Sequence, residues 1–286
     1  MIIGGPSKSF KTWTQLDLAL SVATGSAFWD LETRQTRVLF CNLEIQTPFF
    51  WRRVDAICRA KDIGRPADLE AWNLRGFSAP AEILIPKIIT RMEQKEYGLI
   101  ILDPVYKILG DRDENKAGDI ADLLNRLETL AVQTGAAVVF GAHFAKGNAS
   151  QKEAIDRVSG SGSFARDPDS IVMMTAHEEE GAFTVETILR NLQPMESFVV
   201  RRDHPLMVRD EELDPAKLKQ QAGGRVRRTV EEILDLLPEE GATSTQWRDL
   251  ADTEAGIGKT CFYKLVKQAG NRIYKSEVDN RYYMSK

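Results

Sequence analysis

The stretch from Gly4 to Thr12 constrains the fold more than any other part of this 286-residue chain. Its sequence is Gly-Gly-Pro-Ser-Lys-Ser-Phe-Lys-Thr, and it lies between a short apolar run at 1–3 and a helical pattern from Lys11 to about Ala23. A strand, a turn of small residues and a Lys-Thr pair at a helix start form the layout of a P-loop. Backbone N–H groups of such a turn and the positive end of the helix surround a phosphate group. The stretch therefore predicts a phosphate-binding site.

The predicted contacts with a nucleotide cover this whole turn, namely Gly5, Pro6, Ser7, Lys8, Ser9, Phe10, Lys11 and Thr12. We expect Lys11 to place its ammonium group on the β- and γ-phosphates of ATP, and Thr12 to offer its hydroxyl group to Mg²⁺. Phe10 departs from the pattern G-x-x-x-x-G-K-[ST], because it stands at the second glycine. If the backbone there needs a positive φ, phenylalanine is strained. A plain Gly/Ser-rich turn before a helix is the alternative interpretation.

Composition excludes some classes of protein. With 38 Lys and Arg against 42 Asp and Glu, the formal net charge is −4, so any surface that binds nucleic acid must be local. The three cysteines, Cys41, Cys58 and Cys261, have no metal-site spacing, and their odd number indicates reduced thiols. No signal peptide and no apolar run near 18 residues is present, so we expect a cytoplasmic protein without membrane contact.

Strand and helix patterns alternate over residues 1–208, which predicts an α/β domain with a mostly parallel central sheet. After the P-loop, we expect strands at 37–42, 72–74, 97–103 and 136–143 and helices at 48–61, 79–95 and 119–133. Three later strands, at 170–175, 182–190 and 198–201, are joined by short turns and are expected to be antiparallel.

Polar residues at strand ends are the candidate catalytic groups. Asp103 closes a continuous apolar run, at the end of a strand where α/β sheets bind ligands, and is expected to hold Mg²⁺ with Thr12. Glu44 follows the strand at 37–42, which we expect beside the P-loop strand, so that its carboxylate orients the attacking water. His143 ends the strand after Asp103, where it would sense the γ-phosphate. The alternatives are a turn-forming Asp before Pro104, a Glu that caps a helix and a structural His.

Several cations have candidate roles in binding a neighbouring subunit or DNA. One of the arginines after the late strands, Arg190 first, then Arg201 or Arg202, is a candidate arginine finger for a neighbour's γ-phosphate. The Gly/Ser-rich stretch 144–163 carries Lys146, Lys152 and Arg157, which are candidates for contact with a DNA backbone. The alternative for each is a solvated surface cation.

Composition changes at Arg209, so we expect a linker at 209–224 and a small domain at 225–286. Helices expected at 229–237, 243–251 and 258–269, followed by a two-stranded segment at 272–283, form a winged helix-turn-helix pattern. Its last helix and wing are basic, with Lys259, Lys264, Lys267, Arg272, Lys275 and Arg281, which predicts duplex DNA binding. Protein contacts are the alternative. The sequence Gly-Ile-Gly-Lys-Thr at 256–260 is taken as the turn into the third helix, because Thr253 stands where a second P-loop needs glycine.

The motifs together resemble a known family. V-L-F-C-N-L-E at 38–44, L-I-I-L-D-P at 99–104, V-V-F-G-A-H-F-A-K-G at 138–147 and S-G-S-G-S-F at 159–164 follow the P-loop in the order found in RecA-like ATPases of the RepA type. These are hexameric replicative helicases of plasmids and phages. The resemblance implies a RecA-like P-loop core and a homo-oligomeric ring, favoured as a hexamer, with ATP sites between subunits.

The resemblance also implies residue roles. Lys11 and Thr12 would bind phosphate and Mg²⁺, Asp103 would bind Mg²⁺, Glu44 would be the catalytic carboxylate and His143 the sensor. This chain departs from the family at three positions: Phe10 replaces glycine, Ala142 replaces a first histidine, and Leu192 replaces the second cation of a Lys-x-Arg pair that begins here with Arg190.

We therefore expect a DNA-dependent ATPase motor, a ring helicase of a plasmid, phage or other mobile element, whose loops after Asp103 and His143 grip single-stranded DNA. The alternative is an initiator or regulator in which ATP controls DNA binding without unwinding. A recombinase, the third hypothesis, would form filaments, and the sequence shows no N-terminal polymerisation segment that favours it.

Overall fold

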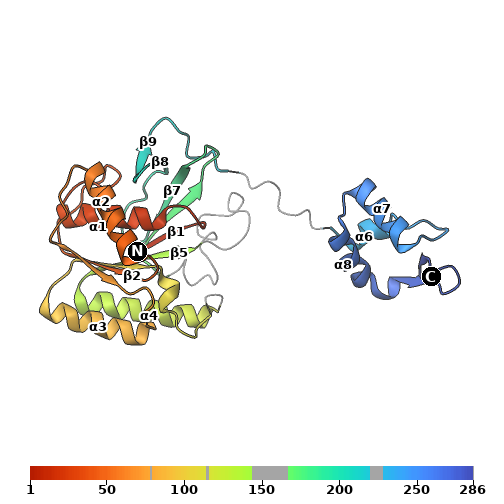
Figure 1. Cartoon of the computed structure of the whole chain (residues 1–286), viewed down its shortest axis with the longest axis horizontal. Helices are drawn as coiled ribbons and strands as arrows, with labels where there is room; N and C mark the ends of the chain where they lie inside the picture. The colour runs from red at the N-terminus through yellow and green to blue at the C-terminus, as the bar shows by residue number, and fades with distance from the viewer. Residues whose placement is uncertain (78, 114–115, 144–166, 220–227, 286) are drawn as a thin grey trace. The chain divides into compact units, whose positions relative to one another are not determined.

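The computed structural model describes residues 1–77, 79–113, 116–143, 167–219 and 228–285. It divides into two compact units, Met1–Gln221 and Ala222–Lys286, which are described separately (Figure 1). The predicted DNA-contact residues Lys146, Lys152 and Arg157 lie outside the described residues, as do the Ser-Gly-Ser-Gly-Ser-Phe motif and the stretch 220–227.

A nine-stranded sheet forms the centre of the first unit, in the order β3-β2-β4-β5-β1-β6-β7-β8-β9. The strands from β3 to β6 in this order pair in parallel, and β6 to β9 pair antiparallel, so the sheet is mostly parallel, as predicted. The strands are β1 (Ile2–Gly5), β2 (Val38–Asn42), β3 (Leu69–Asn73), β4 (Leu99–Asp103), β5 (Ala137–His143), β6 (Ser170–Ala176), β7 (Ala182–Leu189), β8 (Phe198–Asp203) and β9 (Leu206–Asp210).

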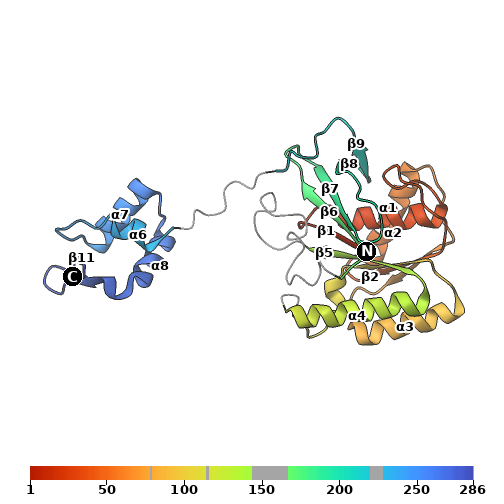
Figure 2. The same ribbon diagram turned by 180° about the vertical axis from the view of Figure 1, so that it is seen from behind.

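Helices cover both faces of this sheet, which explains why its central strands are continuous apolar runs. Figures 1 and 2 show α1 (Lys11–Thr24) and α2 (Thr47–Ala60) on one face and α3 (Ala81–Gln94) and α4 (Ala117–Thr134) on the other. Each face has its own buried cluster of apolar side chains. A short 3₁₀ helix, η1 (Val105–Ile108), follows β4. Among the described helices, none has the length and apolar character needed to cross a lipid bilayer.

The strand order differs from one expectation. The predicted pairing of the strand at 37–42 with the P-loop strand is wrong, because β2 lies between β3 and β4, and β1 lies between β5 and β6. The apolar runs of buried parallel strands are alike, so they do not specify which strands pair. The carboxyl ends of the parallel strands nevertheless meet at one edge, with Gly5 opposite His143 and Asn42 opposite Asp103.

The first unit also extends beyond the predicted linker start at 209. Arg209 and Asp210 belong to β9, which pairs with β8, and Asp210 forms an ion pair of 2.8 Å with Arg201. Further along, the Lys219 N–H donates to the Ala176 carbonyl at 2.8 Å. The segment is polar because β9 is an edge strand whose side chains are largely solvated. Its composition therefore resembled that of a linker and did not predict a strand.

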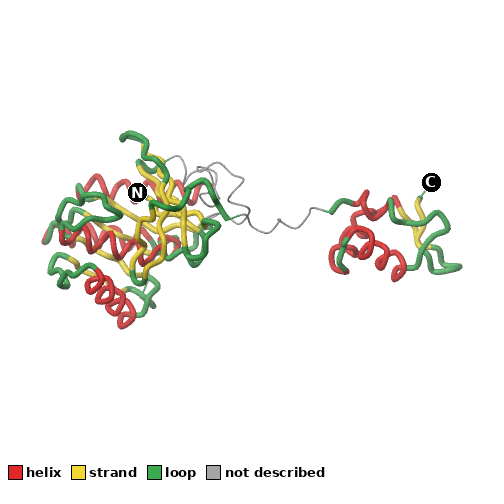
Figure 3. The backbone as a smooth tube through the Cα atoms, turned by 90° about the horizontal axis from the view of Figure 1, so that it is seen from above, coloured by secondary structure: helices red, strands yellow, loops and turns green. Residues whose placement is uncertain are grey.

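Over residues 228–285, the second unit contains three α-helices and a two-stranded antiparallel sheet (Figure 3). Its elements are α6 (Val230–Leu234), α7 (Ser244–Ala255), α8 (Lys259–Ala269), the 3₁₀ turn η4 (Gly270–Arg272), β10 (Ile273–Lys275) and β11 (Tyr282–Met284). Compared with prediction, α6 ends earlier and α7 ends later. Trp247 lies at the centre of the core: its indole N–H donates to the Ile233 carbonyl at 2.7 Å, and its ring packs against Phe262.

Candidate active site

The turn between β1 and α1 has the backbone of a tight phosphate-binding loop. Lys8 and Phe10 both have positive φ, 64° and 60° respectively. Gly5 ends β1 where a side chain would not fit, because a Cβ atom there would lie 2.7 Å from Ser9 Oγ and 3.0 Å from the Met174 carbonyl oxygen. Glycine at this position therefore lets the loop fold back over the end of the sheet.

Phe10 adopts the left-handed conformation that the P-loop pattern reserves for glycine, with φ 60° and ψ 20°. A non-glycine residue in this region costs about 1–3 kcal/mol. Packing of the ring offsets part of that cost: it makes an edge contact with Phe183 at 6.1 Å, and the Arg202 guanidinium group lies 4.6 Å from its centroid. The expected strain is thus present, and the aromatic side chain is held by the late strands of the sheet.

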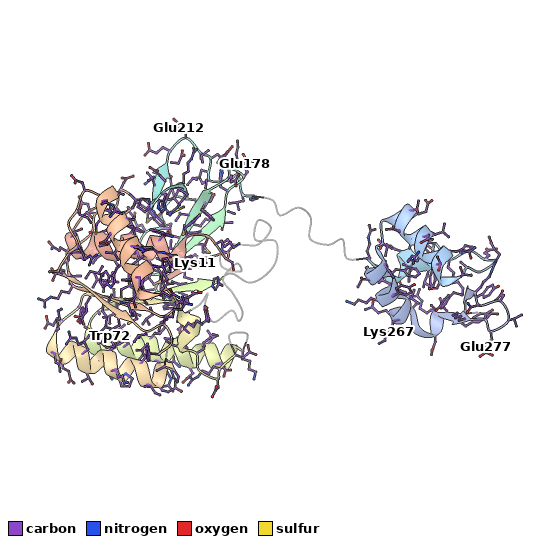
Figure 4. The ribbon with its side chains drawn as sticks, viewed as in Figure 1. Lys11, Trp72, Glu178, Glu212, Lys267 and Glu277 are labelled. Atoms are coloured by element: carbon purple, nitrogen blue, oxygen red, sulfur yellow. The ribbon has the colours of Figure 1, made fainter. Side chains whose placement is uncertain are left out.

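Lys11, labelled in Figure 4, begins α1. Its ammonium group turns back over the loop. Nζ donates to the carbonyl oxygens of Gly5 at 2.9 Å and Pro6 at 2.8 Å, and lies 3.3 Å from Ser9 Oγ. Burial lowers the pKa of Lys11 to about 8, while nearby Asp103 and Glu44 oppose that shift. Lys11 has no ion-pair partner within the part of the chain that the structure describes, so its charge is held by neutral acceptors alone.

Thr12 and Asp103 meet across the interface between α1 and β4. The Thr12 hydroxyl donates to Asp103 Oδ2 at 2.6 Å. Asp103 is buried, and burial raises its pKa to about 6, against the lowering effect of the Thr12 hydrogen bond. A hydroxyl and a carboxylate are oxygen ligands of the kind that Mg²⁺ prefers. This pair could hold the metal that both residues were predicted to bind.

Two further residues shape this contact and were not predicted. With its amide oriented to satisfy both neighbours, Gln15 donates to Asp103 Oδ1 at 2.8 Å and accepts from the Gly141 N–H at 2.8 Å. Gly141 lies in β5, where a Cβ atom would be 2.8 Å from Asp103 Oδ1. The sequence gives no signal that separates Gln15 from the other polar residues of α1, because Thr14, Asp17 and Ser21 are buried as well.

Glu44 and His143 lie at the same edge of the sheet. Glu44 follows β2, and the adjacent Leu43 N–H donates to the Asp103 carbonyl at 2.9 Å, which joins the ends of β2 and β4. The Glu44 carboxylate is exposed and close enough to contribute to raising the pKa of Asp103. His143 is the last residue of β5, is exposed, and has its ring 6.1 Å from that of Tyr106.

The structure separates the three candidate arginines. Arg190 follows β7 beside the start of β6, so it lies at the opposite edge of the sheet from the P-loop, with its guanidinium 3.7 Å from Asp169. Arg201 pairs with Asp210. Arg202 alone reaches the P-loop of its own chain, where it contacts Phe10.

We predict that Gly141→Ala destabilises the protein by about 1–3 kcal/mol, because the added methyl group must displace Asp103 or Gln15. The control is Gly118→Ala in α4, where nothing lies within 4 Å of the added Cβ atom. That change should be neutral or stabilise by up to about 1 kcal/mol. Chemical denaturation followed by circular dichroism measures both, and equal effects of the two changes would contradict the close contact at Gly141.

The raised pKa of Asp103 predicts a pH dependence of stability in EDTA. The folded protein holds this proton more tightly than the unfolded chain, so the contribution is full below about pH 4 and is lost as pH rises through about 6. In the wild type, the free energy of unfolding should fall by about 1–3 kcal/mol between these pH values, and in Asp103→Asn this fall should be absent. Urea denaturation at several pH values measures the difference, with the exposed Asp111→Asn as control. Identical pH profiles for wild type and Asp103→Asn would refute the prediction.

Comparison with known families agrees with this geometry. The model of the AAA_25 family, described as an AAA domain, matches residues 1–149, which is more than half of the chain. No curated protein matches the sequence. The matched segment contains the P-loop, Glu44, Asp103 and His143. The chain therefore belongs to the AAA_25 family, and its first unit is a RecA-like P-loop ATPase domain.

Proposed function

We propose that this protein is a DNA-dependent ATPase motor, a RepA-like replicative ring helicase of a plasmid, phage or other mobile element. One observation carries the catalytic part of this proposal. The Thr12 hydroxyl and the Asp103 carboxylate lie 2.6 Å apart, beside the buried Lys11 ammonium group, which has only neutral hydrogen-bond acceptors among the described residues. Such a site offers the Lys11 ammonium group to a phosphate and a pair of oxygen ligands to a divalent cation.

The residues present fit Mg²⁺ and ATP. Lys11 and the backbone amides of the turn would hold the β- and γ-phosphates. Thr12 and Asp103 would hold Mg²⁺, since both present oxygen atoms at the same point. A phosphate would replace the loop carbonyls as partner of Lys11, so binding relieves the cost of a buried cation.

Three residues of the chain then have catalytic roles. Glu44, exposed at the edge of the sheet, accepts a hydrogen bond from the attacking water and orients it. Lys11 stabilises negative charge that develops on the phosphate oxygens. His143, opposite Gly5 in the neighbouring strand, links the occupied site to the segment that follows β5. Magnesium, when bound, neutralises charge on the transferred phosphoryl group.

The position of Arg190 excludes a finger role in its own ATP site. It is at the opposite edge of the sheet from its own P-loop, so a role as arginine finger requires the site of a neighbouring subunit. A homo-oligomeric ring, favoured as a hexamer, supplies that neighbour. Single-stranded DNA would pass the loops after Asp103 and His143.

The second unit is proposed to bind duplex DNA through α8. Lys259, Tyr263 and Lys267 follow one another at intervals of four residues and are all exposed, with Lys264 beside them. Figure 4 shows Lys267 on this helix and Glu277 in the turn between β10 and β11. A basic helix face in a chain of net charge −4 is a local attraction for phosphate groups.

We predict Mg²⁺-dependent ATP hydrolysis that increases when single-stranded DNA is added, measured as phosphate release. Lys11→Ala should lower turnover roughly 100-fold or more, because the charge on the phosphates is no longer stabilised. Glu44→Gln should lower it by about 100-fold and leave ATP binding intact, because only the orientation of the water is lost. Exposed residues on α3 provide matched controls, Lys87→Ala and Glu93→Gln, which should behave as wild type.

The outcome also separates the motor from its alternative. Turnover that responds to single strands of any sequence supports the motor. ATP binding without turnover, combined with a preference for one duplex, would sink the motor and favour the initiator or regulator. Turnover that survives Glu44→Gln unchanged would remove Glu44 from the mechanism.

For α8, we predict that Lys264→Gln and Lys267→Gln each weaken duplex binding, measured by fluorescence anisotropy. Each lost phosphate contact should reduce the slope of log affinity against log salt concentration by about 0.9. Lys217→Gln, an exposed cation of the first unit, is the control. A salt slope unchanged by both α8 substitutions would show that the helix uses another partner.

A further inference from the structure

Two arginines and a tryptophan form a layer beside the P-loop that the catalytic proposal does not use. The Arg53 guanidinium of α2 lies 4.9 Å from the centroid of the Trp13 ring, and the Arg202 guanidinium of β8 lies 4.8 Å from the same ring. Arg202 also lies 4.6 Å from the Phe10 ring. We call Arg53, Trp13 and Arg202 the arginine layer.

The arginine layer is attached to the residues that flank the phosphate-binding pair. Phe10 directly precedes Lys11, and Trp13 directly follows Thr12. Arg202 contacts both aromatic rings, so it spans the start of α1 from one side of the Lys-Thr pair to the other. All four side chains of this contact set, Phe10, Trp13, Arg53 and Arg202, are partly exposed, so a ligand can reach them.

The arginines carry charge that no carboxylate contacts. Within the described residues, neither Arg53 nor Arg202 has an ion-pair partner, whereas the adjacent Arg201 pairs with Asp210 at 2.8 Å. Burial lowers the pKa of Arg202, and the nearby charge of Arg53 lowers it further. Two like charges have been brought together here, which is costly unless an anion joins them.

The carboxylates that offset the charge of Arg53 have another function in the proposed site, whereas Asp203 offsets part of the charge of Arg202. Asp103 and Glu44 are the groups whose charge favours the ionised form of Arg53. If Mg²⁺ binds at Thr12 and Asp103, it neutralises part of that negative charge, and Arg53 loses part of its compensation. An anion at the arginine layer would restore it, so metal binding and anion binding should favour each other.

We propose that Arg53 and Arg202, organised by Trp13, form a second anion site beside the P-loop that binds a phosphate group. Guanidinium groups present forked donors that match phosphate oxygens, and stacking on an aromatic ring fixes their orientation. The phosphate belongs either to the nucleotide held by the P-loop or to a nucleic-acid backbone. The nucleotide alternative rests on the proposed ATP site, and the nucleic-acid alternative does not.

Arg202 also has a structural contribution that the test must separate. Its Nη1 donates to the carbonyl oxygens of Pro205 at 2.5 Å and Leu206 at 3.3 Å, and its Nη2 lies 2.7 Å from His204 Nδ1. These contacts hold the turn between β8 and β9. Arg53 has no such bonds among its described contacts, so it is the cleaner position for substitution.

The test uses the full chain and the variants Arg53→Gln and Arg202→Gln. Each has a matched control at the neighbouring arginine: Arg52→Gln, which is exposed on α2, and Arg201→Gln, which is exposed on β8. Calorimetric titration with a non-hydrolysable ATP analogue and Mg²⁺, and separately with an oligothymidine single strand, gives the two affinities. Tryptophan fluorescence follows the same titrations, with Trp13→Phe identifying the signal from the arginine layer. Thermal melting of each variant without ligand reports folding.

We expect Arg53→Gln and Arg202→Gln each to lower the affinity for one of the two ligands about tenfold, which is the loss typical of one charge-assisted hydrogen bond. The affinities of both control variants should equal those of the wild type. Weaker ATP binding assigns the phosphate to the nucleotide. If the substitutions weaken oligonucleotide binding, and still do so in a protein that also carries Lys11→Ala, the phosphate belongs to nucleic acid. If Arg202→Gln melts early, Arg53→Gln decides. Affinities of Arg53→Gln equal to those of Arg52→Gln for both ligands would overturn the proposal.

This result is independent of the ATPase test. A protein that hydrolyses ATP with Lys11 and Glu44 but is insensitive to Arg53→Gln would retain the proposed function and lose the second anion site. A protein that binds ATP or DNA through the arginine layer without turnover would retain the anion site and lose the motor.

Discussion

The hydrogen bond of 2.6 Å between the Thr12 hydroxyl and the Asp103 carboxylate is the interaction on which the site depends. It joins the first turn of α1 to the end of β4, two elements that are 91 residues apart in the chain. Gln15 and Gly141 complete the environment of Asp103, one by a hydrogen bond and the other by leaving room for it. Strand pairing brings the phosphate loop to the carboxylate edge of the sheet, and this contact joins Thr12 directly to Asp103 there.

Electrostatic compensation explains why these groups can be buried together. Burial disfavours the charged form of both side chains. It therefore lowers the pKa of Lys11 and raises the pKa of Asp103. Each partly offsets the other through space, although they form no ion pair, and each keeps hydrogen bonds to uncharged partners. A site in this state gains more from a bound metal and phosphate than one whose charges already neutralise each other.

Phe10 connects the loop to the late strands of the sheet. A glycine at this position would adopt the positive φ without strain, but it has no side chain to pack. The phenylalanine ring contacts Phe183 of β7 and Arg202 of β8. The departure from the P-loop pattern thus exchanges backbone strain for contacts with the antiparallel half of the sheet. Arg202 lies over the Trp13 ring as well, so the same side chain belongs to the arginine layer.

The sequence by itself determined the local features: the P-loop from Gly5 to Thr12, the apolar run ending in Asp103, the alternation of strands and helices, and the sharp strain at Phe10. These depend on residue type and short spacing, so they are visible without a fold. Tertiary structure alone decided the strand order, which separates β1 from β2, the inclusion of β9 in the first unit, and the assembly of Gln15, Gly141 and Arg202 around the site. Each of these is a contact between segments distant in the chain, and apolar periodicity is the same whichever strand lies alongside.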